Sequence, residues 1–222
     1  QDIASAGIRS LIIAYPCGYN APELSKLLYI GGRGTGGYVN GFNLDYNCLG
    51  SFSGLNENQF AKLLDMAESG NGGWVSTHYH QIGSSKDSLD SMLARLVPYM
   101  QAGKLWSTTF AKASQYGQER DTATLTMGAT GRDLITFTLT DRMNDLLFDQ
   151  ALTIKIKVDG TWSGVRAYQN GQEMPARVVT DGGETYLFVD AIPDRGEVTV
   201  VRTEYQDQAI GTDRIAFTPT DT

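Results

Sequence analysis

Hydrophobic and polar positions alternate in two different ways along the chain. Up to about residue 120, the apolar runs SLIIAYP (10–16), WVSTHYH (74–80) and KLWSTTF (104–110) predict buried strands. Between them, apolar residues recur every three to four positions at 55–70 and 86–101, which predicts amphipathic helices. This order of strands and helices is typical of an α/β fold.

After residue 120, apolar residues recur at every second position instead. LTIKIKV (152–158) alternates apolar and charged residues, and NG, DG and GG pairs separate about seven such runs. We therefore expect an α/β domain over 1–120 and a small antiparallel β-sandwich over 121–205, with the boundary near 119–122. The polar tail 206–222 is expected to be partly disordered or to add an edge strand.

Composition narrows the range of partners. The 222 residues carry 18 Lys and Arg against 25 Asp and Glu, a net charge of -7. No run of basic residues is present to bind a phosphate backbone, so we expect no nucleic-acid partner. No apolar run approaches the roughly 20 residues of a membrane span. Neutral or cationic ligands such as sugars fit this composition better.

The sequence gives less information about the cellular compartment of the protein. The N-terminal stretch lacks the plan of a signal peptide and leads almost directly into a strand, as a cleaved or truncated chain would. Cys17 and Cys48 are the two cysteines of the chain. They can pair in an oxidising compartment or remain buried thiols, and the sequence leaves both alternatives open.

The two histidines of the chain, His78 and His80, lie one residue apart on the expected strand 74–80. Side chains at positions i and i+2 of a strand point to the same face. A metal site needs at least a third ligand, and none lies at a recognisable spacing. A general acid or base at the end of a strand is a second interpretation, since the histidine pKa suits that role. A histidine that simply bonds to a neighbouring loop is the third.

Glycines and aromatic residues give weaker signals. GRGTGG (32–37) matches a dinucleotide-binding fingerprint, but the following YVNGFNLDYN is not helical, so we interpret the glycines as a turn. Arg33, between two glycines, is either a partner for an anion or carboxylate or a solvated charge. Trp74 is one of several aromatic residues at expected strand ends or in loops that can stack on sugar rings.

The order of these segments resembles the later half of a NodB-like polysaccharide deacetylase, the chitin-deacetylase type of carbohydrate esterase. Tyr15, Pro16 and Gly18 match a Y-P-x-G motif of that family, and His80 with Ile82 matches a late His-x-Ile motif. LWSTTFAKASQYGQER resembles the closing strand and helix. The resemblance covers residues 8–120, and the strands beyond it resemble accessory β-domains of such enzymes.

The resemblance implies the later part of an irregular (β/α) barrel and the removal of acetyl groups from an acetylated polysaccharide. It implies zinc or another divalent metal in the full-length enzyme, with His80 as the catalytic acid. Residues of the substrate groove are then Tyr15, Pro16, Gly18, Arg33, Trp74 and His78. The chain lacks the family's T-F-D-D-G and H-x-x-x-H motifs. We therefore expect no metal bound by this chain alone, and a missing N-terminal segment or self-association.

Two function classes follow. The first is a deacetylase fragment, extracellular or periplasmic, that is inactive by itself. The second is a non-catalytic carbohydrate-binding or assembly-forming protein that reuses the fold.

Overall fold

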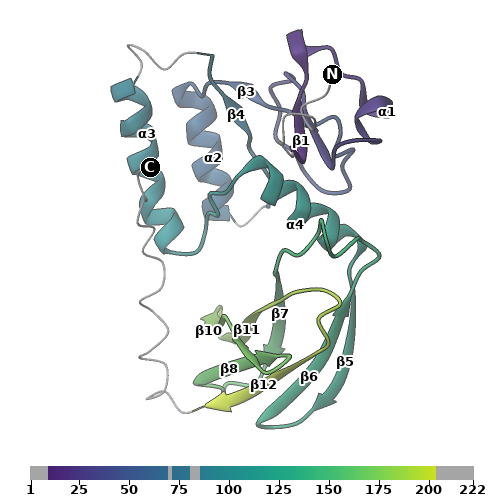
Figure 1. Ribbon diagram of the computed structural model, residues 1–222. Helices are drawn as coiled ribbons and strands as arrows, with labels where there is room; N and C mark the ends of the chain where they lie inside the picture. Colours follow the sequence, from purple (N-terminus) through teal and green to yellow (C-terminus); the bar gives the residue numbers. More distant parts are fainter. Residues whose placement is uncertain (1–9, 70–71, 81–85, 204–222) are drawn as a thin grey trace, which may run out of the picture. The chain divides into compact units, whose positions relative to one another are not determined.

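The computed structural model describes residues 10–69, 72–80 and 86–203 (Figure 1). The chain divides into two compact units, Gln1–Asp121 and Thr122–Thr222. Each unit is described by itself. The expected tail 206–222 and Ile82 of the His-x-Ile motif lie outside the described residues. In the described part, no helix is long and apolar enough to cross a membrane.

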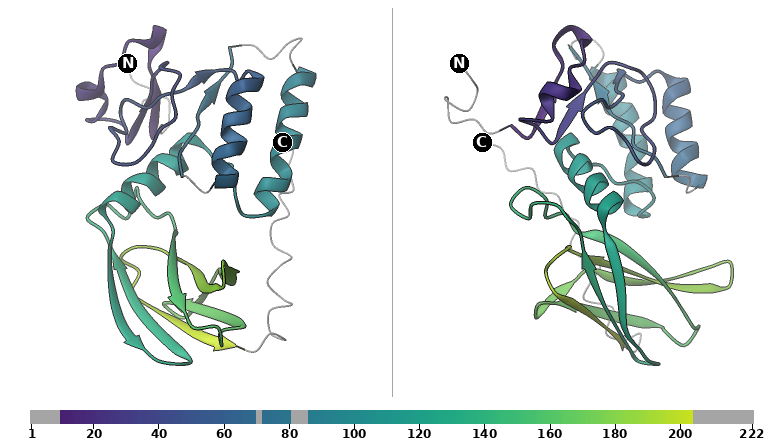
Figure 2. Two further views of the ribbon diagram at one scale, coloured as in Figure 1. Left: turned by 180° about the vertical axis from the view of Figure 1, so that it is seen from behind. Right: turned by 90° about the vertical axis from the view of Figure 1, so that its right-hand side faces the viewer.

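The described residues of the first unit form short strands, a 3-10 turn and four helices. In chain order they are β1 (Ile12–Ala14), η2 (Pro16–Gly18), α1 (Pro22–Ser25), β2 (Gly31–Arg33), β3 (Phe52–Ser53), α2 (Glu57–Ser69), β4 (Thr77–His78), α3 (Lys86–Gln101) and α4 (Phe110–Thr122). Helices α2 and α3 contact one another and lie side by side (Figure 2).

The strands of this unit form two parallel pairs, β1–β2 and β3–β4, rather than a barrel. An isolated parallel bridge joins Arg33 of β2 to Leu49 in the connection that precedes β3. The expected (β/α) barrel is therefore wrong, since no closed ring of strands exists among the described residues. Barrel closure requires every strand to pair on both sides. Here the strands have two or three residues, and the glycine-rich connection 34–51 replaces the crossover helix of a βαβ unit.

The expected strand KLWSTTF is also absent. Residues 104–109 contain no strand, and Phe110 begins α4 instead. An apolar run becomes a strand when a neighbouring strand supplies partners for its backbone groups. No described strand pairs with this segment, so its side chains line a cavity without strand geometry.

Asn40 fixes the glycine-rich connection. Its side chain is fully buried, donates to the Gly50 carbonyl at 3.0 Å and accepts from the Gly50 amide at 2.8 Å. Its backbone exchanges two hydrogen bonds with Trp74, at 2.9 and 2.8 Å. One amide side chain thus satisfies two backbone groups of a buried loop and holds the loop against Trp74.

Replacing Asn40 with alanine should lower the free energy of unfolding by about 1–3 kcal/mol, because both polar groups of Gly50 lose their partner. Chemical denaturation measures the change. Gln172→Ala, which removes an exposed amide from β9, is the matched control and should alter stability by less than about 0.5 kcal/mol. Equal stability of Asn40→Ala and the control would contradict this role.

The described residues of the second unit, 122–203, form eight strands in two antiparallel sheets. They are β5 (Thr124–Thr130), β6 (Leu134–Thr140), β7 (Leu152–Val158), β8 (Gly164–Gln169), β9 (Gln172–Met174), β10 (Ala176–Asp181), β11 (Glu184–Ala191) and β12 (Glu197–Thr203). One sheet has the order β5-β6-β12-β8-β9 and the other the order β10-β11-β7. Strand β8 of the first sheet contacts β10 and β11 of the second.

The core of this unit is built from the apolar residues that occupy every second position of its strands. Alternate residues of β6, β11 and β12 are buried, and Phe137, Leu187 and Val198 are fully inaccessible. Side chains of the other register face away from that core. The described part of the all-β unit therefore has one shared core between two sheets, and the alternate side chains of each strand point away from that core.

Candidate functional site

The short parallel pair β3–β4 and the residues that directly precede its strands bring together a small polar cluster around His78. This half-buried histidine ends β4, and its Nδ1 lies 2.9 Å from the Oγ of Ser51. The Ser76 hydroxyl donates to the same Ser51 oxygen at 3.3 Å. Because Ser53 pairs with His78, strand alternation places Ser51, Ser76 and His78 on one face.

Electrostatics keep His78 neutral. Burial lowers the pKa of His78 below its ordinary value, and electrostatic repulsion from Arg33 and His80 acts in the same direction. The imidazole is therefore uncharged at neutral pH and has one nitrogen lone pair available. Ser51 fixes the ring orientation through Nδ1.

This lowered pKa predicts a pH dependence of stability. Since the pKa of His78 is lower in the folded chain than in the unfolded one, its contribution is complete above about pH 6.5 and is lost as the pH falls toward the folded value. We expect the melting temperature to fall less between pH 7.5 and 5 in His78→Gln than in the natural chain. Circular dichroism melts at stepped pH measure the difference. Identical pH profiles for the two proteins would contradict the expectation.

His80 lies beside this cluster but is exposed. Its ring centroid is 5.8 Å from that of His78, with the planes nearly perpendicular at 86°. Its assignment as a catalytic acid stays a prediction. No group of three or more His, Cys, Asp or Glu side chains that could hold a metal occurs among the described residues.

The predicted groove residues near the N-terminus have structural contacts. Tyr15 is buried, and its hydroxyl lies 2.6 Å from both Ser25 Oγ and the Asn47 carbonyl oxygen. Pro16 and Gly18 form η2, where Gly18 has a φ of 73°. No hydrogen bond or ring contact within the described residues links these three to His78. They position the turn after β1, and whether they touch a ligand stays a prediction.

Two details complete this region. Cys17 and Cys48 are both free thiols, so the structure contains no disulfide between them. The glycines of GRGTGG allow close packing: a Cβ on Gly32 would lie 2.8 Å from the Tyr15 hydroxyl oxygen. This close approach accounts for Gly32 without a bound phosphate.

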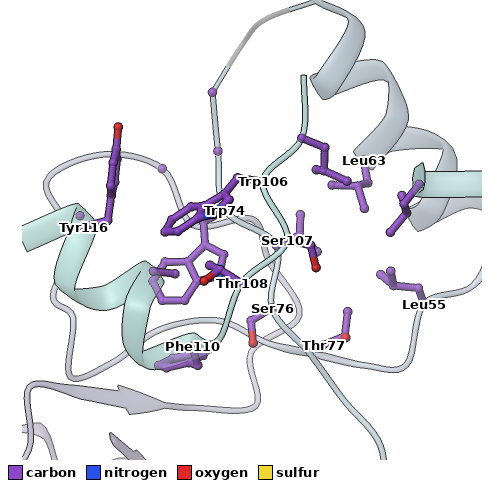
Figure 3. Close-up of a pocket in the computed structure, with 18 of the residues that line it drawn as sticks. Leu55, Leu63, Trp74, Ser76, Thr77, Trp106, Ser107, Thr108, Phe110 and Tyr116 are labelled. Carbon is purple, nitrogen blue, oxygen red and sulfur yellow. The ribbon is translucent and has the colours of Figure 1, made fainter. Parts of the chain in front are cut away.

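A cavity of about 500 Å³ lies beside this cluster. Its lining comes from the loop at 41–46, helices α2 and α3, the segment 72–79 and the segment 104–120. Figure 3 shows the aromatic rings gathered on the side of α4, with Leu55 and Leu63 across the cavity. Ser76, Thr77 and Tyr79 also line it, so β4 borders both the cavity and the His78 cluster.

Two pairs of rings form the aromatic wall. Trp74 packs on Phe110 with ring centroids 4.8 Å apart, and Trp106 packs on Tyr116 at 5.4 Å. Trp106 is 55% exposed although its neighbour supports it. A large ring held in place with one face open to solvent is suited to stacking on a ligand.

The polar groups of the wall are hydroxyls and cations. Thr77, Ser107 and Thr108 supply hydroxyls. The cations Lys104 and Arg120 also line the cavity, and each forms an ion pair at 2.7 Å, with Glu68 and Asp121 respectively. Tyr46 also lines it and donates to Asp121 at 2.7 Å. Burial, helped by Asp121, raises the pKa of Tyr46 far above its ordinary value, so this hydroxyl stays protonated.

Trp74 of this wall was placed in the predicted groove from the sequence. Trp106 was counted only among the aromatic residues that can stack on sugar rings, and Tyr116 was not singled out. Trp74 and Trp106 are more than thirty residues apart in the chain, and Tyr116 lies on the helix that follows. The local pattern of apolar residues does not predict a contact between side chains so far apart in the chain. The sequence feature that could have indicated a shared site is that both tryptophans lie in segments rich in Ser and Thr.

Comparison with curated proteins finds a gellan lyase from a Bacillus species that is 29% identical over 229 residues. The alignment covers 88% of this chain but 9% of the lyase, so the chain corresponds to a small part of that protein. No protein-family model matches the chain, and no solved structure matches it.

This similarity overturns the resemblance to polysaccharide deacetylases. The matching protein is a polysaccharide lyase, and nothing in the comparisons supports deacetylation, a hydrolase or a NodB-like family. The motifs Y-P-x-G and His-x-Ile are short, and the buried hydrogen bonds of Tyr15 give the first of them a structural role in this fold. The interpretation as a deacetylase fragment is therefore wrong.

Proposed function

We propose that the first unit binds a segment of a polysaccharide in the aromatic cavity and serves as a recognition part of a polysaccharide-degrading protein. The observation that carries this proposal is the ring of Trp106, which is 55% exposed, packs on Tyr116 and borders a cavity of about 500 Å³.

The chemistry of the wall suits a sugar. Aromatic faces attract the C–H edges of a pyranose ring, and they bring large contact area with little loss of side-chain freedom. Hydroxyls of Thr77, Ser107 and Thr108 can bond to sugar hydroxyls. The volume lies within the usual range of small-ligand pockets, roughly 300–1,000 Å³. Lys104 and Arg120 each pair with a carboxylate, Glu68 and Asp121 respectively, so the rings and hydroxyls of the wall, rather than a net charge, favour a sugar.

The similarity to a gellan lyase supports the same class of ligand. A polysaccharide that lies outside the cell is too large to pass a membrane unaided, so a protein that binds such a polymer acts outside the cell. We accordingly propose an extracellular location for the chain. Gellan is the first polysaccharide to test.

Affinity electrophoresis is the experiment for this proposal. The chain is run in native gels with and without gellan, beside a protein of similar charge that binds no glycan. Retardation that grows with gellan concentration is expected. Equal migration in both gels would contradict the proposed function.

A second candidate function, elimination at His78, is favoured by the neutral histidine with Arg33 near it. In an elimination, a base removes the proton on the carbon beside a carboxylate, the adjacent carbon–oxygen bond breaks, and the leaving oxygen takes up a proton. In the tautomer that carries its proton on Nδ1, His78 donates a hydrogen bond to the Ser51 oxygen, and the Nε2 lone pair is then available as the base. Arg33 is the cation that would neutralise the carboxylate.

A further inference from the structure

We propose that the outer face of the sheet β10-β11-β7, in the second unit, is a separate binding surface for an acidic polysaccharide. We call it the cationic ring face and define it by Lys155, Lys157, Arg177, Tyr186 and Phe188. It goes beyond the cavity of the first unit and does not depend on it.

The two rings lie on the same side of β11. Tyr186 and Phe188 are two residues apart and partly exposed, whereas the alternate residues Leu187 and Val189 are fully buried in the core. Successive residues of a strand point to opposite faces. The rings therefore stand next to one another on the face that looks away from the sandwich core, about 7 Å apart along the strand.

Cations flank these rings from both neighbouring strands. Phe188 pairs with Lys155 of β7 on one side and with Arg177 of β10 on the other. The Lys155 ammonium lies 3.9 Å from the Tyr186 ring centroid and 5.7 Å from that of Phe188. The Arg177 guanidinium lies 4.8 Å from the Phe188 centroid. Attraction between the cations and the faces of the rings holds both charges over the sheet.

Within the described residues, two of these charges have no carboxylate partner. Lys157 pairs with Glu184, but no ion pair between described residues involves Lys155 or Arg177. A cation held by a ring keeps hydrogen-bond donors directed to solvent, where an anion can accept them. The whole chain carries a net charge of -7, so a polyanion needs a local positive surface such as this one to bind.

An acidic polysaccharide matches both parts of this face. Its carboxylates complement Lys155 and Arg177, and the apolar side of its sugar rings complements Tyr186 and Phe188. A polymer of phosphates would use the charges and leave the rings without a role. We therefore assign the face to an acidic sugar polymer rather than to a phosphate polymer.

Affinity electrophoresis of the intact chain tests the assignment, with polygalacturonate, neutral dextran or polyphosphate in the gel. All proteins carry Trp106→Ala, so that the cavity of the first unit does not contribute. We expect retardation by polygalacturonate that weakens with added salt, and none by dextran. Lys155→Ala with Arg177→Ala, and separately Phe188→Leu, should each weaken the interaction about tenfold.

Arg166→Ala is the matched control, because it removes an arginine from β8 of the other sheet. It should bind polygalacturonate as its parent does, and circular dichroism melts check that every variant is folded. Three results would overturn the assignment: no retardation by polygalacturonate, an equal loss in Arg166→Ala, or equally strong retention by polyphosphate that Phe188→Leu leaves unchanged. None of these depends on whether the cavity of the first unit binds sugar.

Discussion

Replacing Trp106 with alanine should weaken the binding of gellan fragments about 30-fold or more. Tryptophan anchors at binding sites commonly cost about 2 kcal/mol or more when they are truncated. Trp106 meets the conditions for such an anchor, since Tyr116 supports it and much of its surface is open. Because the side chain is 55% exposed, its loss should leave the unfolding free energy almost unchanged. Isothermal titration calorimetry measures the affinity.

Tyr19→Ala is the control for this variant. Tyr19 is 82% exposed and does not line the cavity, so it tests the loss of an exposed ring elsewhere in the same unit. Its affinity should equal that of the natural chain. Equal affinities of Trp106→Ala and Tyr19→Ala for gellan fragments would contradict a role of Trp106 in binding them.

Replacing His78 with glutamine should lower any elimination activity on gellan by about 100-fold or more, since a positioned general base contributes about 10²–10⁴-fold. Glutamine keeps a polar group that can reach Ser51 but cannot take up a proton. The absorbance of the carbon–carbon double bond formed in the product measures the rate. Product from the natural chain is itself required, because an inactive chain would exclude the second candidate function.

Two further variants separate the roles of the histidines. Tyr19→Ala should retain the full rate. His80→Gln should retain most of it, because His80 is exposed and touches the cluster through its ring contact with His78 alone among the described interactions. A large loss of elimination rate in His80→Gln, together with a small loss in His78→Gln, would identify His80 rather than His78 as the base.

Local signals were sufficient for much of the second unit. The alternation in LTIKIKV predicts a strand, and β7 spans those same residues, which confirms it. The Asn170-Gly171 pair predicts a tight hairpin turn. Both residues have positive φ, 51° and 76°, between β8 and β9, as such a turn requires. These features depend on neighbours in the sequence, so they can be read without the fold.

The first unit depended on contacts that the sequence does not record. Whether strands close into a barrel is decided by pairing between distant segments, and here the pairing ends at short parallel pairs. Arg33 and His78 were selected from the sequence, and the structure brings Arg33 close enough to influence the pKa of His78. Ser51, which orients His78, had no sequence signal, because its role arises from strand register across 27 residues. Trp106 and Tyr116 were left out of the predicted groove for the same reason.

Amide hydrogen exchange of the intact chain, with and without gellan oligosaccharides, tests the central claim most directly. The proposed saccharide site predicts slower exchange on binding in the segments 74–79 and 104–117, which line the cavity. Unchanged exchange in both segments at saturating oligosaccharide would contradict a saccharide site in the first unit.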